Sequence, residues 1–399
     1  MCGIAGVVDT SGKLNESLLE KMSEVIRHRG PDDNGVYFDR EKGVGFVHRR
    51  LSIIDLKSGH QPMHSCDDSC VIIFNGEIYN YKIINAQLQK EGMKFRTNSD
   101  TETILNVYLK KGMEGFNLLN GMFAFAIYDK KKNKVILARD NFGVKPLYYS
   151  FTTNGLTFAS EIKAILQNKD YKPELDYSAF NSFLTYRYNP SPQTLFKNIF
   201  KLKPGEYLEY NLDGSYMLNF FDKSEPEIDN TLKEADAIEE YSRLLENSVN
   251  RQLTSDVPIG LFLSGGIDSA VLGHFMKNEI KENYDSFTVG FTGEGSYNEI
   301  NDANYSAEIT GSKNYTRTLS KEEYISFFQK SFYYLEEPVA EATVPALYYL
   351  SHLASTHVKV VLAGQGADEP LAGYRRYYGE SKISKYQSLL NLLPLNILS

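Results

Sequence analysis

Short apolar or alternating runs, each bounded by Gly, Asn or Asp, dominate the first half of the chain. Such runs are typical of β-strands separated by turns. We expect strands within residues 43–54, 70–80, 121–129, 134–140 and 155–160. Residues 16–28 and 100–112 instead carry apolar side chains at helical spacing, and residues 201–218 predict a closing hairpin. The pattern therefore predicts a β-rich first domain with flanking helices.

The pattern changes after residues 222–237, which are polar and acidic and contain Pro226. Beyond them, helical and strand patterns alternate. We expect helices within 237–253, 269–280, 299–310 and 345–357, and strands within 257–264, 286–291 and 358–364. Nearly unbroken apolar strands that alternate with helices predict an α/β domain whose parallel sheet is covered on both faces.

These patterns divide the chain into three parts. Residues 2–210 form the first domain, residues 211–235 a linker, and residues 236–399 the second domain. A chain of 399 residues is long enough for two such domains.

Composition narrows the class of protein. With 42% hydrophobic residues the chain has ample material for two cores. The net charge of −8 argues against a nucleic-acid-binding surface. There is no long uncharged apolar run and no basic segment at the N-terminus, so we expect neither a membrane span nor a signal peptide. Three cysteines are too few for a disulfide framework, which makes the cytoplasm the expected compartment.

Cys2 directly follows the initiator methionine. If Met1 is removed, Cys2 carries a thiol and a free α-amine, and the amine can act as a base toward its own side chain. The plainer interpretation is a small buried cysteine near a terminus. Cys2 alone does not decide between the two.

Three further segments favour the interpretation of Cys2 as a nucleophile over that of a buried structural cysteine. Arg50 begins a strand edge where its guanidinium fork could clamp a carboxylate. Asn75 and Gly76 lie where an apolar strand turns, and a side-chain amide with the next backbone N–H makes a two-donor oxyanion hole. Asp100, just ahead of a helix, is either an N-terminal cap or an anionic partner for a substrate ammonium.

Together these segments resemble the glutamine amidotransferase domain with an N-terminal nucleophilic cysteine. The matching segments are Met1-Cys2-Gly3-Ile4, Arg27-His28-Arg29-Gly30-Pro31-Asp32, Arg50-Leu51-Ser52-Ile53, Asn75-Gly76-Glu77-Ile78-Tyr79-Asn80, and Arg139-Asp140 with Gly143 and Pro146-Leu147-Tyr148. The resemblance implies an α+β fold in which a sandwich of two antiparallel sheets is flanked by helices.

The resemblance also implies roles. Cys2 would attack the glutamine amide, while Asn75 and Gly76 would stabilise the oxyanion. Arg50 and Asp100 would hold the α-carboxylate and α-amine of the substrate. The expected glutamine-binding residues are Arg50, Leu51, Ser52, Ile53, Ile54, Asn75, Gly76, Glu77 and Asp100.

Two glycine loops follow apolar strands in the second domain. The first is Ser264-Gly265-Gly266-Ile267-Asp268-Ser269, and the second is Ala363-Gly364-Gln365-Gly366-Ala367-Asp368-Glu369. Glycines allow close approach to a ligand, and a helix N-terminus offers free N–H groups to phosphate. Ligands of α/β sheets lie at the carboxyl ends of strands, so the loops are expected to face one another. Asp268 and Asp368 could then share Mg²⁺, which prefers one or two carboxylates plus phosphate oxygens.

The first loop resembles the pyrophosphatase loop of enzymes that adenylate a substrate. Combined with the first domain, it makes the chain similar to glutamine-hydrolysing asparagine synthetases. The resemblance implies that ATP activates aspartate as β-aspartyl-AMP and that ammonia released at Cys2 displaces AMP. The expected ATP-binding residues are Phe262, Ser264, Gly265, Gly266, Asp268, Ser269, Val289, Ala363 and Gly364.

Two alternatives stay open. The chain could amidate another carboxylate, such as one on a cell-surface sugar or peptide, or it could be a non-catalytic scaffold. A homodimer is the assembly that we consider, and glutamine, aspartate and ATP are the expected substrates.

The chain departs from the family pattern at two points. The family carries Ser-Gly-Glu-Gly-Ser-Asp-Glu at the second loop, whereas Gln365 replaces the glutamate thought to assist adenylation. The second domain also looks incomplete at its C-terminus, and it ends in an apolar tail, 389–395. We therefore expect this chain to hydrolyse glutamine, to make little asparagine and to self-associate.

Overall fold

The structure is a computed structural model that describes residues 1–221, 227–280, 283–293 and 298–390. Its contacts divide the chain into two compact units. The first unit combines Met1–Val257 with Glu322–Pro345, and the second combines Pro258–Lys321 with the chain from Ala346 onward. The expected linker, 211–235, lies partly outside the described residues, and its first part contains strand structure. The domain boundaries drawn from the sequence stay a prediction.

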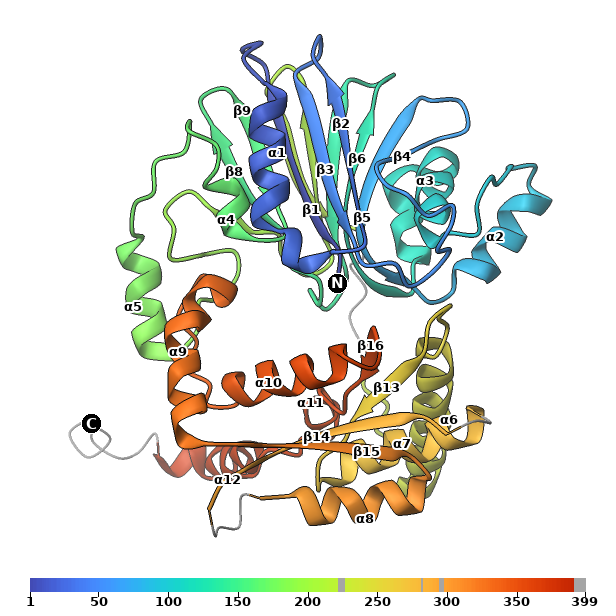
Figure 1. The fold of residues 1–399 in the computed structure, drawn as a ribbon, viewed down its shortest axis with the longest axis vertical. Coiled ribbons are helices and arrows are strands. Elements are labelled where there is room, and N and C mark those ends of the chain that lie inside the picture. The colour runs from blue at the N-terminus through green and yellow to red at the C-terminus, as the bar shows by residue number, and fades with distance from the viewer. Residues whose placement is uncertain (222–226, 281–282, 294–297, 391–399) are drawn as a thin grey trace. The chain divides into compact units, whose positions relative to one another are not determined.

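The first unit contains two six-stranded antiparallel sheets (Figure 1). The first sheet has the order β10-β8-β9-β1-β3-β2. Its strands are β1 (Gly3–Asp9), β2 (Asp33–Asp39), β3 (Val44–Arg50), β8 (Tyr148–Thr152), β9 (Gly155–Ala159) and β10 (Phe200–Lys201). The second sheet has the order β12-β11-β7-β6-β5-β4. Its strands are β4 (Met63–His64), β5 (Cys70–Ile78), β6 (Gly121–Asp129), β7 (Lys134–Arg139), β11 (Glu206–Asn211) and β12 (Tyr216–Phe220).

The described helices of this unit range from single 3₁₀ turns to α6, which has 19 residues. They are α1 (Glu16–Val25), η1 (Arg27–Arg29), α2 (Tyr81–Lys90), α3 (Asp100–Lys111), η2 (Gly112–Leu118), α4 (Ile162–Ile165), α5 (Tyr177–Tyr186), α6 (Glu234–Gln252) and α9 (Lys321–Leu335). The sequence did not predict α2, α5 or α9. The helix at 16–28 is confirmed in part, since α1 ends at Val25 and a separate 3₁₀ turn follows.

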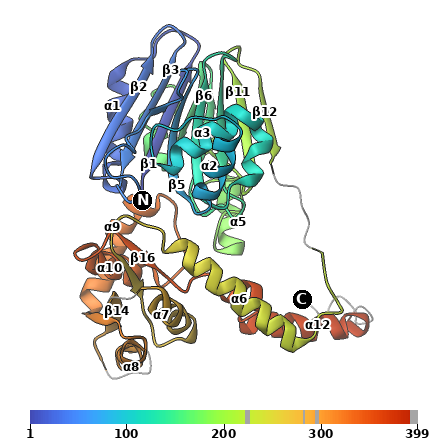
Figure 2. The ribbon, with the colours of Figure 1, turned by 90° about the vertical axis from the view of Figure 1, so that its right-hand side faces the viewer.

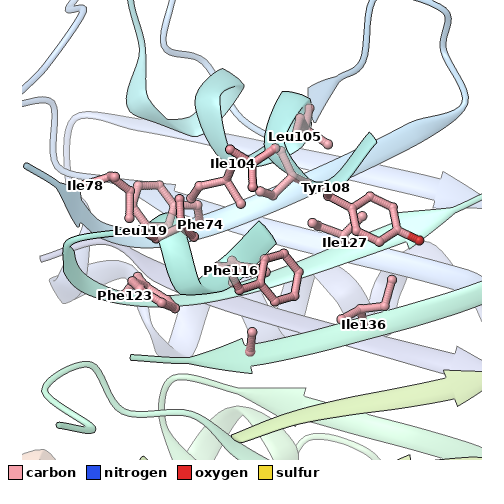
Figure 3. Packing of buried hydrophobic residues seen from close by; sticks show 14 of the residues in the cluster. Phe74, Ile78, Ile104, Leu105, Tyr108, Phe116, Leu119, Phe123, Ile127 and Ile136 are labelled. Atoms are coloured by element: carbon pink, nitrogen blue, oxygen red, sulfur yellow. The ribbon is translucent and has the colours of Figure 1, made fainter. Parts of the chain in front are cut away.

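Three apolar clusters hold the first unit in layers. One cluster fills the space between the sheets and includes Phe46 and Phe158 from one sheet and Tyr128 from the other. A second lies between the first sheet and helices α1 and α4. The third lies between the second sheet and helices α2, α3 and η2, as Figures 2 and 3 show. Because strand side chains alternate between faces, each sheet buries both faces. The expected sandwich of two antiparallel sheets flanked by helices is confirmed.

The second unit has one four-stranded parallel sheet of order β15-β14-β13-β16. Its strands are β13 (Ile259–Phe262), β14 (Asp285–Phe291), β15 (Lys313–Leu319) and β16 (Val360–Leu362). Its helices are α7 (Ile267–Glu279), α8 (Ile300–Thr310), α10 (Val344–Ser355), of which Ala346 onward belongs here, α11 (Asp368–Leu371) and α12 (Arg375–Leu390). The expected parallel sheet is confirmed, while β15, a polar edge strand, was not predicted.

Register shows which helices cover which face of this sheet. Phe262 pairs with Phe287, and Phe287 packs in a cluster that contains Ala354 of α10. Leu261 projects from the opposite face, because neighbouring residues of a strand alternate. A Cβ added at Gly273 of α7 would come within 3.2 Å of the Leu261 side chain. Helices therefore cover both faces, and the carboxyl ends of β13 and β16 are neighbours.

Candidate active site

Cys2 lies at the start of β1, next to the end of β3. The backbone N–H of Leu51 donates a hydrogen bond to its Sγ at 3.4 Å, and Arg29 Nε donates to its carbonyl oxygen at 3.0 Å. Burial raises the pKa of the Cys2 thiol, whereas the Leu51 backbone contact and the nearby N-terminal ammonium act in the opposite direction. Burial also lowers the pKa of the Met1 α-amino group to about 6. The thiol therefore needs a base, and an amine at this end of the chain is poised to be neutral at pH 7.

Arg50 is buried at the end of β3 and shapes the loop that follows. The expectation that Arg50 begins a strand edge is wrong, because residues 51–62 form no strand. Nη2 of Arg50 donates to the carbonyl oxygens of Ile54 at 3.0 Å and Asp55 at 2.8 Å. A Cβ on Gly59 would lie 2.2 Å from the same nitrogen, so the loop closes over the guanidinium only with glycine there. Arg50 thus organises the loop, and its contact with a substrate carboxylate stays a prediction.

Asn75 is fully buried in β5, paired with Ala124 of β6. The turn expected at Asn75 and Gly76 is wrong, because β5 stays paired with β6 as far as Ile78. Among the residues that the structure describes, neither Oδ1 nor Nδ2 of Asn75 has a hydrogen-bond partner. An unsatisfied buried amide costs about 1–3 kcal/mol, and such groups in native proteins call for an explanation. The adjacent Gly76 leaves no room for a side chain, since a Cβ would lie 2.2 Å from the Met122 carbonyl oxygen. Asn75 therefore keeps an unused amide donor beside a position that only glycine fits.

Glu77, which is partly buried, and Asp100, which is buried, form a pair of neighbouring acids. Burial raises the pKa of Glu77 well above its usual value, and the Asp100 charge raises it further. Burial also raises the pKa of Asp100 to about 6, although backbone N–H groups oppose this shift. The helix cap expected as one role of Asp100 is wrong, because Ser99 caps α3 and Asp100 is its first residue. The other expected role of Asp100, as the partner of a substrate ammonium, stays a prediction.

These residues line one pocket, together with others that the sequence did not suggest. The predicted residues in its wall are Cys2, Arg50, Leu51, Ile53, Ile54, Gly76, Glu77 and Asp100. Gly59, Gln61, Phe74, Ser99 and Thr101 complete it. Ser52 and Asn75 are not in the wall: the Ser52 N–H donates to Asp32 at 2.9 Å, and Asn75 lies behind Gly76 in the sheet.

Two buried polar residues support the strand beneath this pocket. The amide of Gln61 accepts from the Phe74 N–H at 2.7 Å and donates to the Thr101 hydroxyl at 3.2 Å. Burial lowers the pKa of His48 to about 3, so its imidazole is neutral, and Nε2 donates to the Phe74 carbonyl at 3.0 Å. No sequence signal marks either residue, since both act through strands distant in the chain.

The first glycine loop of the second unit connects β13 to α7. The Ser269 hydroxyl lies 3.0 Å from the Ser264 hydroxyl and accepts from the Ser264 N–H at 3.0 Å. The Gly265 N–H donates to the carboxylate of Glu299 at 3.0 Å. The Glu299 carboxylate therefore already takes up one backbone N–H group of the loop predicted to bind phosphate. Glu299 was not foreseen from the sequence.

The second glycine loop meets the first, as parallel pairing of β13 with β16 requires. A Cβ on Gly364 would lie 3.1 Å from the Asp268 Cβ and 3.1 Å from the Ser269 nitrogen. Val289 lies in β14, and Thr288 beside it donates to the Leu263 carbonyl at 2.7 Å. Gln365 and Ala363 are exposed in the second loop. The roles of these residues, and those of Phe262 and Gly266, in binding ATP stay predictions.

Asp268 is the second residue of α7 and Asp368 the first of α11, and these helices follow two neighbouring strands. Two carboxylates fit Mg²⁺, which completes its coordination with phosphate oxygens and water. In the described part of the chain, no group of three or more His, Cys, Asp or Glu side chains is arranged to hold a metal alone. The carboxylates of Asp268 and Asp368 could therefore hold Mg²⁺ only together with phosphate oxygens or water, and not as a site made of protein side chains alone.

Comparisons with known proteins agree in both halves of the chain. The family described as "Glutamine amidotransferase domain" matches residues 1–221, and that described as "Asparagine synthase" matches residues 240–396. "Asparagine synthetase [glutamine-hydrolyzing] 1" of Bacillus subtilis is 37% identical over 94% of this chain and 59% of its own length. "Putative asparagine synthetase [glutamine-hydrolyzing] 2" of Methanocaldococcus jannaschii is 33% identical over 94% of this chain and 76% of its own.

A third relative has a different name. "Amidase chry2" of Gibberella zeae is 31% identical over 96% of this chain and 60% of its own length. The chain spans about three-fifths of the length of the Bacillus and Gibberella relatives.

No helix among the described residues is both long and apolar enough for a bilayer crossing.

Proposed function

The chain belongs to the family of glutamine-hydrolysing asparagine synthetases, and on this premise we propose that it transfers ammonia from glutamine to an ATP-activated aspartate. The single observation that carries the proposal is the buried Asn75 amide, whose polar atoms are unpaired within the described structure, next to the pocket of Cys2. A binding protein gains nothing from such an arrangement, whereas acyl transfer uses it as an oxyanion donor.

In the first half-reaction, the Cys2 thiolate attacks the side-chain carbonyl of glutamine. The proton of the thiol passes to the α-amine that Cys2 exposes once Met1 is removed. Asn75 Nδ2 and the Gly76 N–H stabilise the oxyanion, and the C–N bond breaks to release ammonia. Water then hydrolyses the thioester to glutamate. Arg50 pairs with the α-carboxylate of the substrate, while Glu77 and Asp100 receive its ammonium.

In the second half-reaction, a carboxylate oxygen of aspartate attacks the α-phosphate of ATP and pyrophosphate leaves. Ammonia then attacks the acyl carbon of β-aspartyl-AMP, and AMP leaves as asparagine forms. Backbone N–H groups of the Ser264–Ser269 loop hold the phosphates. Mg²⁺, held by Asp268 and Asp368, would neutralise phosphate charge.

A direct assay tests the whole proposal. The chain is incubated with glutamine, aspartate, ATP and Mg²⁺, and glutamate, pyrophosphate and asparagine are measured. Formation of all three, each dependent on its own substrate, supports it. Glutamate without pyrophosphate limits the activity to the first half-reaction, and absence of glutamate overturns the role of Cys2.

The residue Gln365 favours a second candidate function, in which the chain amidates a carboxylate other than that of aspartate. Gln365 stands where the family carries a glutamate thought to assist adenylation, and a neutral amide cannot act as a base. Gln365 still offers hydrogen-bond donors to a carboxylate other than that of aspartate. Pyrophosphate release that depends on another carboxylate, and not on aspartate, would favour this alternative.

The setting of the reaction is part of the same proposal. Cys2, Cys66 and Cys70 are free thiols, as befits the cytoplasm. A homodimer is the expected assembly, and light scattering of the purified chain tests it.

A further inference from the structure

Asp256 makes two hydrogen bonds to the loop that lines the Cys2 pocket. The Asp55 N–H donates to Asp256 Oδ2 at 2.8 Å, and the Asp256 N–H donates to the Ile53 carbonyl at 3.1 Å. The two partners are 201 residues apart in the chain. These bonds flank Ile54, and both Ile53 and Ile54 are part of the pocket wall.

The loop needs support because it has no regular secondary structure between Arg50 and Met63. Asp55 has φ of 50°, a left-handed conformation that costs free energy for a residue with a side chain. Its carboxylate accepts from the Ser58 N–H within the loop at 3.0 Å and from the Asn98 N–H, outside the loop, at 2.9 Å. Its backbone N–H is satisfied from outside the loop, by Asp256.

Arg50 and Asp256 both hold this loop, but they bind different backbone atoms of it. Arg50 holds the carbonyl oxygens of Ile54 and Asp55, whereas Asp256 holds the nitrogen of Asp55 and the carbonyl of Ile53. Together they hold both sides of the Ile54–Asp55 peptide unit and the carbonyl oxygens on either side of it, those of Ile53 and Asp55. Loss of the Asp256 acceptor would therefore release the pocket wall without touching Arg50, Asn75 or Cys2.

We propose that Asp256 is a positioning residue for glutamine, which fixes the backbone from Ile53 to Asp55 and so shapes the wall that the substrate contacts. This inference rests on the proposed glutaminase function. Asp256 does not contact the reacting atoms. Its substitution should therefore weaken substrate binding more than it slows the chemical step.

Three variants of the full chain separate the possible causes. Asp256→Ala removes the acceptor and the charge. Asp256→Asn removes the charge but keeps an oxygen that can accept from the Asp55 N–H. Ser255→Ala is the matched control, because the Ser255 hydroxyl contacts Val257 and not the loop.

The readouts are steady-state glutamine hydrolysis and amide hydrogen exchange of peptides that cover residues 51–60. We expect Asp256→Ala to raise KM for glutamine about fivefold, the effect of one lost hydrogen bond, with kcat within about twofold. Asp256→Asn and Ser255→Ala should stay near the wild-type KM. Exchange in 51–60 should quicken only in Asp256→Ala.

Two results would overturn the inference: an unchanged KM in Asp256→Ala, or an Asp256→Asn variant as weak as Asp256→Ala, which would assign the effect to charge. If the wild-type chain releases no glutamate, the proposed function fails. Hydrogen exchange then still decides whether Asp256 holds the loop, so the two failures are distinguishable.

Discussion

The carboxylate of Asp100 accepts a hydrogen bond from the backbone N–H of Ile78 at 3.0 Å. Ile78 ends β5, the strand that carries Asn75 and Gly76. The contact therefore ties the first turn of α3 to the strand of the expected oxyanion hole. It also leaves an acid buried at the place where a substrate ammonium is expected.

Glutamine binding should depend on pH through Asp100. Its pKa, about 6 in the folded chain, is raised above the usual value. Folding stability from this group is therefore present at acidic pH and is lost as pH rises through about 6. Binding runs the other way, because only the ionised acid attracts an ammonium. KM for glutamine should fall as pH rises from about 5 to about 8.

Asp100→Asn provides the control for this pH dependence. Asparagine keeps an oxygen for the Ile78 N–H but does not titrate. The variant should have a high KM that changes little with pH. Identical pH profiles for variant and wild type would show that Asp100 does not hold the ammonium.

Cys2→Ala should abolish glutamine hydrolysis while ammonia-dependent synthesis continues, because only the first site loses a reacting group. An N-terminal tag that cannot be removed should have the same effect, since it blocks the α-amine. Glutamate release and ammonia-supported amidation are measured side by side. Glutamate from either protein would refute the assignment.

Asn75→Ala should lower kcat for glutamine hydrolysis by about 10²–10³, as loss of an oxyanion donor does. Asn80→Ala is the contrasting variant, because its amide donates to the Leu118 carbonyl and accepts from the Asn120 N–H. We expect Asn80→Ala to lower stability by about 1–3 kcal/mol with kcat preserved. Kinetics and urea unfolding of both variants check the contrast. An Asn75→Ala variant with normal kcat would remove the oxyanion role.

Gly364→Ala should reduce ATP-dependent pyrophosphate release and spare glutamine hydrolysis. The added methyl group would press on Asp268 and Ser269, both within 3.1 Å of it, and so displace the phosphate loop. Gly379→Ala is the matched control, because nothing lies within 4 Å of its added Cβ. Normal pyrophosphate release by Gly364→Ala would mean that the two loops do not form one site.

Glu337→Ala should destabilise the first unit by about 3 kcal/mol, the typical result of breaking a buried ion pair. The Glu337 carboxylate accepts from the Leu195 N–H at 2.7 Å, from Asn189 at 3.0 Å and from Lys201 at 2.9 Å. Glu341 is exposed, so Glu341→Ala should change the free energy of unfolding by less than about 0.5 kcal/mol. Equal unfolding midpoints of Glu337→Ala and Glu341→Ala in urea would show that the contacts of Glu337 do not stabilise the first unit.

The sequence predicted most of the first site because its residues occur in short segments at strand ends. Cys2 directly precedes β1, Arg50 ends β3, and Gly76 lies two residues before the end of β5. The packing of the two sheets then brings these strand ends together at one pocket. Gln61 and His48 could not be predicted, because each acts on Phe74 through a contact that only the folded sheets create. Asp256 escaped notice for the same reason.

The missed elements have local causes. β15 reads Lys-Asn-Tyr-Thr-Arg-Thr-Leu, and its polar side chains conceal a strand that is stabilised by pairing with β14. Helix α9 carries several exposed aromatic residues, among them Phe332 and Tyr333, so its pattern shows no clear polar face. The misassigned cap at Asp100 reflects two adjacent residues, Ser99 and Asp100, that both favour helix starts.

The discontinuous course of the first unit sets an order for its assembly during translation. Glu336 accepts hydrogen bonds from the backbone N–H groups of Ile162 and Lys163, and it belongs to the first unit together with the rest of Glu322–Pro345. Domains form progressively as the chain leaves the ribosome. The ribosome must therefore synthesise β13, β14 and β15 before Glu322–Pro345, the last segment of the first unit, emerges. The first unit is begun first but finished only after most of the parallel sheet has been made.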